Sequence, residues 1–405
     1  MIITKSPATT ADPPSNNSQR RARIKQQIIK KFYKEGQLSI HDICHSVKLS
    51  APTVAKTIDE LIEQQLVIKI GVGGSSGGRR PGIYALNPSS RYVFAIDLER
   101  SFIRMAIFDF TNKPASRVYQ FNEGLDTLPD VFHFINEKIN EILKNNKISK
   151  KKVIGIGLSL PGLIDRNTGL SYTYLKDINP AITLTELTGV KTFVEHDTKV
   201  MALGEQAFGA AKGLNNVLCL NMGSGIGLSM ILNGTIFRGH SGYSGEFGHI
   251  QLDNNGALCH CGKTGCIETM AAGKSIIAKA LKQISEGRNS SLQSFKEIGT
   301  EKLTTSAIIN AAREGDFLSS ELINQAGEAL GKGIAVLVHL FNPELIILGG
   351  ELSKASDMLL KAIERNLDSH TIDRIRKDAQ IVVSELGEDA RIMGTLALVM
   401  SKAFA

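Results

Sequence analysis

Three of the five cysteines of this chain fall within eight residues, ten residues after a histidine. His249 precedes the segment Cys259-His260-Cys261, and Cys266 follows it. Thiolate sulfur and imidazole nitrogen are donors that suit tetrahedral zinc, and Cys₃His is a common closed, structural set. The spacing therefore predicts a structural zinc held by His249, Cys259, Cys261 and Cys266 in a rigid loop. His260, between two of the cysteines, is an alternative to His249 as the fourth ligand.

With 405 residues and 42% hydrophobic side chains, the chain should form two or three globular domains. The remaining cysteines, Cys44 and Cys219, have apolar neighbours, so a reducing cytoplasm is expected rather than a disulfide framework. Residues 1–18 are rich in Pro, Ser, Thr and Asn and lack the apolar core of a signal peptide, which predicts a disordered tail. No run approaches the ~18 apolar residues of a membrane span.

The net charge of +7 is concentrated at the N-terminal end of the chain. Residues 1–91 contain 14 basic and 6 acidic side chains, whereas the remainder of the chain is close to neutral. A basic module of this size indicates contact with the phosphate backbone of a nucleic acid. The alternative is a basic tail that serves only solubility.

Residues 19–88 have the pattern of a winged helix-turn-helix. Apolar residues recur at helical spacing between residues 24 and 32, and Ser39 with Asp42 forms a capping box for a second helix. Ser50 can cap a third helix, because Pro52 fits its first turn. The buried stripe of this third helix is predicted to consist of Val54, Ile58, Leu61 and Ile62.

Polar residues lie on the opposite face of the third helix, near its N-terminus. A recognition helix inserts this end into the major groove. Two strand-like runs then enclose the glycine-rich segment 71–78, which two arginines follow, as in a wing that contacts phosphates or a narrow minor groove. A flexible linker is the alternative. A homodimer or higher oligomer on an inverted-repeat, double-stranded operator is expected. The predicted DNA contacts are Ser50, Thr53, Lys56, Thr57, Arg79 and Arg80.

Beyond residue 91, apolar β-branched runs alternate with amphipathic helical patterns, which predicts an α/β fold. Glycine clusters fall just after strands, where α/β folds bind ligands. Strands are predicted at 92–96, 103–109, 153–160, 192–195, 217–221, 345–348 and 381–384, and helices at 129–145, 198–210, 271–284, 304–313, 318–341, 354–367 and 388–403.

From about residue 90 to the C-terminus the chain resembles the ROK family, named for repressors, open reading frames and kinases. The resemblance rests on Gly-Glu-Phe-Gly-His at 245–249 together with Cys-x-Cys-Gly-x-x-Gly-Cys-x-Glu at 259–268. The winged helix and its Gly-Arg-Arg-Pro segment are similar to those of the repressor branch. The resemblance implies a two-lobed, actin-like sugar kinase (ribonuclease H-like) fold. The smaller lobe would span 89–197 plus 385–405, and the larger lobe 198–384 with the zinc loop.

The resemblance also assigns a ligand site, because the family's zinc ligands and sugar-binding positions can be matched residue by residue. The zinc ligands match the quartet named above. One alternative is that Asp197 acts only as a helix N-cap, and another is that Glu246 and Glu268 only hydrogen-bond the metal ligands. The sugar-binding positions match Gly162, His196, Asp197, Glu246, His249 and Glu268.

The nucleotide-binding motifs of the family's kinases are only partly present. Kinases of the family have Asp-x-Gly-Gly-Thr after the first strand, whereas Asp97 is followed here by Leu-Glu-Arg-Ser at 98–101. Side chains at 99 and 100 would hinder close approach of the backbone to a phosphate. The second glycine turn is kept at 223–227, and Asp197 stands where the kinases have their catalytic base. We therefore expect no kinase activity, no catalytic residue and no bound ATP.

These observations lead to one main hypothesis and two alternatives. The main hypothesis is a sugar-responsive DNA-binding repressor of carbohydrate genes, with a sugar or sugar phosphate bound between the lobes. The first alternative is an ATP-dependent hexose kinase of the ROK type that also carries a DNA-binding domain. The second is a repressor controlled by a partner protein instead of a small molecule. The residues do not identify the sugar.

Overall fold

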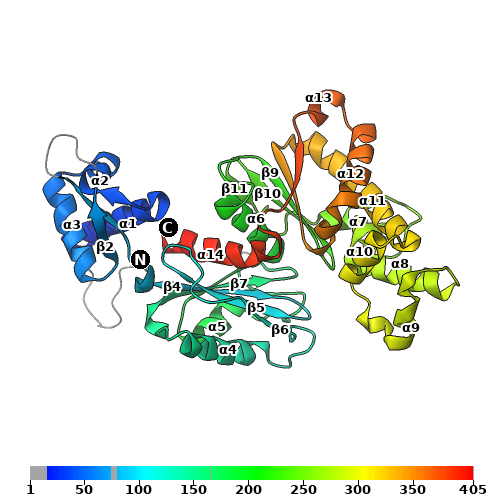
Figure 1. Cartoon of the computed structure of the whole chain (residues 1–405), viewed down its shortest axis with the longest axis horizontal. Coiled ribbons are helices and arrows are strands. Elements are labelled where there is room, and N and C mark those ends of the chain that lie inside the picture. The colour runs from blue at the N-terminus through cyan, green and yellow to red at the C-terminus, as the bar shows by residue number, and fades with distance from the viewer. Residues whose placement is uncertain (1–15, 74–79, 166, 405) are drawn as a thin grey trace. The chain divides into compact units, whose positions relative to one another are not determined.

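The computed structural model describes residues 16–73, 80–165 and 167–404. The chain forms two compact units (Figure 1). The first contains the described residues up to Leu160, with 178–194 and the C-terminal segment from Thr395. The second contains 161–177 and 195–394. Residues 161–177, 195–197 and 385–394 thus belong to the second unit, whereas the predicted boundaries placed them in the smaller lobe. Among the described residues, no helix is long and apolar enough to cross a bilayer.

The N-terminal part of the first unit is a winged helix-turn-helix. Its three-stranded antiparallel sheet has the order β1-β3-β2, and the apolar core includes Ile28, Phe32 and Ile58, all buried. The first helix begins at Asn16, inside the segment for which a tail was expected. The elements are α1 (Asn16–Glu35), β1 (Leu38–Ser39), α2 (Ile40–Val47), α3 (Ala51–Glu63), β2 (Val67–Val72) and β3 (Gly82–Leu86).

The N-terminal caps predicted for α2 and α3 differ in outcome: α2 has its capping box, whereas α3 has no side-chain cap. The capping box is confirmed, because Asp42 N donates to Ser39 Oγ at 3.2 Å and Ser39 N donates to Asp42 Oδ2 at 2.9 Å. Ser50 occupies the N-cap position of α3, but its hydroxyl pairs with the Thr53 hydroxyl at 2.9 Å and does not cap the helix.

The prediction that Ile62 belongs to the buried stripe of α3 was wrong. Its side chain is 36% exposed, whereas Thr57 is only 8% exposed. The buried face follows the spacing i, i+3, i+4, i+7 from Val54, which selects Thr57, Ile58 and Leu61. Thr57 therefore faces inward, although the opposite face was predicted for it.

A five-stranded mixed sheet, ordered β6-β5-β4-β7-β8, forms the rest of the first unit. The backbone of α14 lies close to β7, because a Cβ at Gly157 would be 2.5 Å from the carbonyl oxygen of Thr395. A side chain at 157 would separate the helix from the sheet. The last two elements of this part of the unit continue into the second unit, β8 at its end and α14 at its start. The elements are β4 (Tyr92–Leu98), β5 (Ile103–Asp109), β6 (Tyr119–Phe121), α4 (Val131–Asn145), β7 (Val153–Leu160), α5 (Pro180–Thr188), β8 (Thr192–His196) and α14 (Ala390–Ala403).

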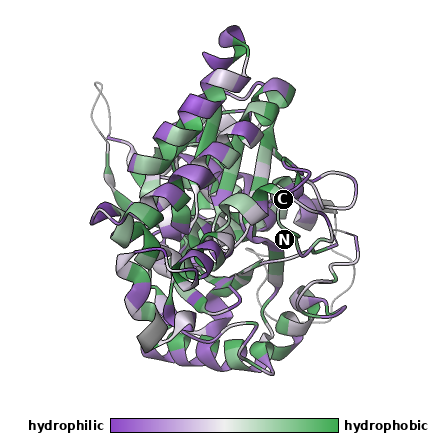
Figure 2. Cartoon of the chain, turned by 90° about the vertical axis from the view of Figure 1, so that its right-hand side faces the viewer, coloured by the Kyte–Doolittle hydropathy of each residue, from purple (hydrophilic) through white to green (hydrophobic). Residues whose placement is uncertain are grey.

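The second unit has its own five-stranded sheet, ordered β11-β10-β9-β12-β13. Alternate residues of β9 enter different apolar clusters: Leu218 and Leu220 pack with residues of α11, and Val217 and Cys219 with residues of α6. The sheet is thus covered on both faces, as expected when both faces of its strands are apolar. In Figure 2 the helices alternate between hydrophilic and hydrophobic residues, in agreement with one-sided burial.

All seven predicted strands beyond residue 91 are present, with ends shifted by at most two residues. The strands β6, β10 and β11 and the helices α5, α7, α9 and α13 were not predicted. The elements of the second unit are α6 (Asp197–Phe208), β9 (Val217–Met222), β10 (Ile226–Leu232), β11 (Thr235–Phe237), α7 (Ile267–Ala271), α8 (Gly273–Ser285), α9 (Phe295–Ile298), α10 (Thr305–Arg313), α11 (Phe317–Phe341), β12 (Leu345–Gly349), α12 (Ser356–His370), α13 (Asp373–Arg376) and β13 (Gln380–Val383).

Candidate metal centre, ligand site and DNA-binding surface

The four predicted metal ligands form one cluster in the second unit. One donor atom from each of His249, Cys259, Cys261 and Cys266 lies within 4.8 Å of all the others. Cys261 Sγ and Cys266 Sγ are 3.7 Å apart, and Cys259 Sγ is 3.5 Å from His249 Nδ1. A tetrahedral zinc with ordinary bond lengths requires about 3.8 Å between two sulfurs and about 3.5 Å between sulfur and nitrogen. These two separations therefore match those of a tetrahedral zinc site, and the donor chemistry suits the same ion.

The alternative ligand His260 fits less well. Its Nδ1 is 3.9 Å from Cys259 Sγ and 3.2 Å from Glu268 Oε1, and its side chain is 63% exposed. The His260 ring contacts the His249 ring edge to face, with centroids 5.0 Å apart. His260 thus covers the cluster from the solvent side, where it can also pair with Glu268.

The backbone around the cluster holds the thiols together before any metal binds. Cys259 N donates to the carbonyl of Lys263, and the Lys263 ammonium donates to the carbonyl of His249, both at 2.7 Å. Gly265 has φ +64°, and a Cβ there would overlap the carbonyl of Asp253. Burial and the neighbouring thiols raise the pKa of Cys266 to about 12. A bound cation would reverse this effect, because it stabilises the thiolate.

His249 connects the metal cluster to the predicted ligand site. While Nδ1 faces Cys259, Nε2 lies 3.9 Å from Glu246 Oε2. Glu246 stands immediately before the short 3₁₀ helix η3 (Phe247–His249), and its carboxylate is 45% exposed. One imidazole can therefore serve the metal through Nδ1 while Nε2 stays available for a polar ligand beside Glu246.

Glu268, on α7, lies beside the glycine turn that joins β9 to β10. Its Oε2 accepts from Ile226 N at 3.3 Å, and Lys274 Nζ lies 2.8 Å from its Oε1. A Cβ at Gly225 would be 2.9 Å from Oε2, so the turn needs glycine there. Glu268 is thus a buried carboxylate that is neutralised by a lysine, while its alternative role at the metal is limited to the contact with His260.

Asp197 and His196 lie at the junction of β8 and α6. His196 is the N-cap residue of α6, and its Nδ1 accepts from Thr198 N at 3.3 Å. Asp197 is the first residue of the helix, and its Oδ2 accepts from Asn221 Nδ2 at 3.4 Å. Arg391 Nη1 is 3.9 Å from the same oxygen. Asp197 is therefore not the N-cap of α6, and groups from two other elements, β9 and α14, lie against its carboxylate.

Several charged residues at this site were missed by the sequence analysis. Lys199 is only 4% exposed, donates to the carbonyl of Gly242 at 2.9 Å, and has its pKa lowered by burial, against the attraction of nearby carboxylates. Arg238 Nε and Nη2 donate to Glu195 Oε2 at 2.9 and 2.8 Å. The only sequence signal for these contacts was Lys199 itself, a lysine among apolar residues of α6. The partners Gly242 and Glu195 are 43 positions from Lys199 and Arg238, respectively, and could not be inferred.

The sixth predicted sugar-binding residue, Gly162, lies at the start of the 161–177 segment. It has φ +83°, and a Cβ would be 2.6 Å from Thr173 Cβ. This segment is linked to the region around Glu246, since Tyr243 OH donates to Asp165 Oδ2 at 3.1 Å. All six predicted sugar-binding residues therefore belong to the second unit.

The loop after β4, where kinases of the family have glycines, is folded against a neighbouring turn. The carbonyls of Glu99 and Arg100 accept from the amides of Leu125 and Asp126 at 3.1 and 2.8 Å. The Arg100 guanidinium also pairs with the Asp126 carboxylate at 2.7 Å. Asp97 itself is fully buried. In a kinase, this loop would have to present backbone amides to a polyphosphate. Here its carbonyls and the Arg100 side chain are bonded to the neighbouring turn instead.

The predicted DNA contacts on α3 are unequally exposed. Ser50, Thr53 and Lys56 are exposed, whereas Thr57 is buried and its hydroxyl donates to the carbonyl of Thr53 at 2.8 Å. In the wing, Arg80 is exposed beyond the hairpin bond from Gly73 N to the carbonyl of Pro81. Arg79 lies outside the described residues. The fold therefore supports surface contacts by four of these residues and gives Thr57 a packing role.

Known proteins resemble this chain over most of its length. A family model described as the ROK family matches residues 93–402. The chain is 31% identical over 369 residues to the DNA-binding transcriptional dual regulator NagC of Escherichia coli (strain K12), which covers 90% of this chain and 89% of that protein. It is 29% identical over 377 residues to the xylose repressor of Bacillus subtilis (strain 168), with 92% and 94% covered.

A solved structure, described as a ROK family transcriptional regulator that is a homolog of the E. coli MLC protein, has a TM-score of 0.77 against this chain. The two are 27% identical, with 94% of this chain and 97% of that chain covered. The fold and the site define an actin-like, sugar-kinase-type α/β protein that carries an N-terminal winged helix. The chain belongs to the ROK family.

Proposed function

We propose that this protein is a sugar-responsive, DNA-binding transcriptional repressor of carbohydrate genes. The observation that carries the proposal is the presence, in one chain, of a winged helix and of a ligand site built from carboxylates and imidazoles. A DNA-binding transcriptional regulator and a xylose repressor each align with about nine tenths of the chain, including part of its N-terminal region. A sugar kinase would not need the winged helix.

The ligand is a sugar or a sugar phosphate, bound by Gly162, His196, Asp197, Glu246, His249 and Glu268. Carboxylates and imidazoles form directional hydrogen bonds with the hydroxyl groups of a sugar. The ligand affects DNA binding only if it favours one conformation of the protein over another. We further propose that the protein binds an inverted-repeat operator as a homodimer.

Kinase activity has been lost, according to this proposal. Glu99 and Arg100 replace glycines, and their carbonyls are already hydrogen-bonded to the turn at 124–128. The amide-lined cradle that phosphoryl transfer requires is therefore missing at this loop. Asp197 keeps the position of the catalytic base and acts as an acceptor for a ligand hydroxyl.

The metal is zinc, and its role is structural. Three thiols and one imidazole complete a tetrahedron, so no coordination position remains for a substrate. Zinc would fix the loop that presents Glu246 and His249 to the ligand.

The first experiment measures DNA binding by fluorescence anisotropy, with tiled duplexes from the region around the protein's own gene, at one fixed salt concentration. Tight binding to a duplex that contains an inverted repeat supports the proposal. A thermal-shift screen over sugars and sugar phosphates, with ATP as a control, identifies the ligand. Asp197→Asn should abolish the ligand's effect on DNA binding and leave binding itself intact.

Two outcomes would favour the alternatives. Brisk release of ADP with a hexose panel, in a coupled assay, would show that the protein is an active kinase. Tight DNA binding without a thermal shift from any sugar would favour control by a partner protein, which a pull-down from the host lysate would then identify.

A further inference from the structure

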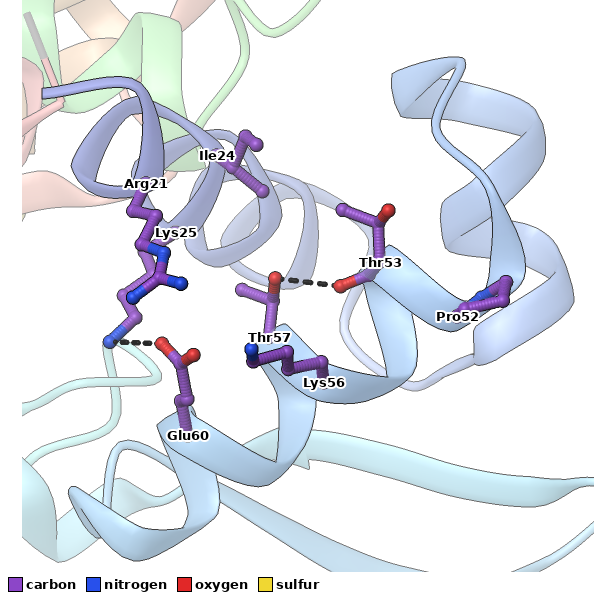
Figure 3. Close-up of a pocket in the computed structure, with 8 residues that line it drawn as sticks. All are labelled: Arg21, Ile24, Lys25, Pro52, Thr53, Lys56, Thr57 and Glu60. Carbon is purple, nitrogen blue, oxygen red and sulfur yellow. Dashed lines mark hydrogen bonds and ion pairs between the residues drawn. The ribbon is translucent and has the colours of Figure 1, made fainter. Parts of the chain in front are cut away.

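A pocket of about 350 Å³ opens between α1 and α3 of the winged helix (Figure 3). We call it the α1–α3 groove. It lies beside the exposed face of α3. Its α3 wall includes the predicted DNA contacts Thr53, Lys56 and Thr57, whereas its α1 wall was not predicted, because α1 and α3 are about 30 residues apart in sequence. The lining residues are Arg21, Ile24, Lys25, Pro52, Thr53, Lys56, Thr57 and Glu60.

The groove concentrates positive charge. Arg21 and Lys25 extend from α1 toward α3, and Lys56 extends from α3 at the same opening (Figure 3). Arg21 and Lys56 are exposed, whereas the Lys25 side chain is only 14% exposed. Three cations thus meet one carboxylate, that of Glu60. This charge balance fits an anionic ligand and opposes a cationic one.

Glu60 partly neutralises the groove through a specific contact. Lys25 Nζ lies 2.8 Å from Glu60 Oε2, and the Glu60 side chain is 29% exposed. The hydrogen bond from Lys25 lowers the pKa of Glu60, and Arg21 and Lys56 contribute to the same shift. All three cations therefore lie near the Glu60 carboxylate. A phosphate bound at this position would be stabilised by the positive charge of all three.

We propose that the α1–α3 groove binds one phosphate of the DNA backbone, with Arg21, Lys25 and Lys56 as donors and Glu60 as the group that the phosphate displaces from Lys25. The proposal rests on the proposed DNA-binding function and deepens it. A phosphodiester is the anion that the exposed end of α3 would bring next to Thr53 and Lys56 in a DNA complex. The contact adds affinity for any sequence and positions α3 without reading bases.

Glu60 acquires a distinct role in this arrangement. In the free protein it holds the Lys25 ammonium, and in the complex its negative charge lies close to the phosphate. The Glu60 charge therefore weakens binding to every duplex. As a result, the affinity for the operator depends more on contacts other than the phosphate contact in the groove.

The test measures binding of the full-length protein to a short random-sequence duplex, by anisotropy, over a range of KCl concentrations. Lys25→Gln should reduce the steepness of log K against log[KCl] by about 0.9 for each bound protomer, the value for one lost phosphate contact. Glu60→Gln should tighten binding about fourfold for each protomer, the factor that one charge about 5 Å from a phosphate produces in water.

Matched controls come from the same helix. Lys31 and Glu35 form an i,i+4 ion pair near the other end of α1, so Lys31→Gln and Glu35→Gln change the net charge by the same amounts. We expect these controls to leave both the slope and the affinity nearly unchanged. Equal effects in the two pairs would overturn the proposal, because they would show only a long-range charge effect. An unchanged slope in Lys25→Gln would overturn it as well.

Inorganic phosphate serves as a second probe, because a free anion could in principle use the same groove. At equal ionic strength, phosphate should compete with DNA more strongly than chloride, and this difference should disappear in Lys25→Gln. Phosphate that stabilises the wild-type protein through Lys25 without displacing DNA would assign the groove to a free anion and overturn the proposal. If the wild-type protein bound neither this duplex nor any genomic duplex, the DNA-binding function itself would fail, a result distinct from failure of the groove variants alone.

Discussion

Replacement of Cys261 by alanine separates the metal's contribution from that of the side chain. Cys261 is the exposed member of the quartet, whereas Cys259 and Cys266 are buried. Loss of an exposed thiol removes little packing, so it should cost less than about 0.5 kcal/mol by itself. A larger loss of stability in Cys261→Ala must therefore come from the missing metal ligand.

The expected magnitude follows from the loop that the metal closes. The ligands lie at both ends of the segment from His249 to Cys266. Closing a loop of about 17 residues removes about 3 kcal/mol of chain entropy from the unfolded state. In a unit of about 200 residues, 3 kcal/mol corresponds to a drop in melting temperature of roughly 6–12 °C.

The assay combines metal analysis with thermal melting. Plasma emission spectrometry of the purified protein should give one zinc per chain for the wild type and much less for Cys261→Ala. A strong chelator should lower the melting temperature of the wild type and leave that of the variant unchanged. Cys44→Ala, which removes a half-buried free cysteine from α2, is the matched control and should keep its zinc.

A metal-free wild type that melts within 1 °C of Cys261→Ala, and that still responds to its ligand, would refute this reasoning. The quartet would then be a cluster of reduced thiols without a structural role.

Three further predictions concern single residues of the described chain. Gly265→Ala should lose zinc, because a Cβ would overlap the Asp253 carbonyl, whereas Gly262→Ala, which is strained only by its φ of +88° and has no atom within 4 Å of its Cβ, should retain more of it, as metal analysis would show. Ser39→Ala should lower the stability of the winged helix by about 1 kcal/mol in denaturant titrations, since the capping box is lost. Burial raises the pKa of Asp316, but hydrogen bonds from backbone amides and serine hydroxyls outweigh it and lower the pKa to about 2. This carboxylate therefore stabilises the fold above pH 4, and Asp316→Asn should cost about 2 kcal/mol at pH 7, a difference that shrinks as the pH falls through about 2. Equal stability of wild type and variant at pH 7 would contradict this last prediction.

Features that depend on a few neighbouring residues were predictable from the sequence. The capping box of α2 needs two residues three positions apart, and β5 and β7 have the bounds expected from their apolar runs. The metal quartet was also predictable, since His249 and the three cysteines fall within 18 residues and only a few donor combinations suit a tetrahedral ion.

Features that depend on distant partners were not predictable. Arg238 and Glu195 are 43 positions apart, and nothing near either residue indicates that they pair. The strand β10 pairs antiparallel with β9 and begins at Ile226, inside the range 223–227 that was predicted to be a glycine turn. Thr57 was predicted to be exposed because it is polar, but the packing of α3 turns it inward.

The alternation of the two units along the chain has a consequence for synthesis on the ribosome. The winged helix is complete by Leu86, but the sheet of the first unit packs against α14, which begins only at Ala390. At 5–20 residues per second, roughly 15–60 s separate these two events. The nascent chain therefore exposes a finished DNA-binding module before either α/β unit can close, and chaperones would have to protect the uncovered face of β7 during that interval.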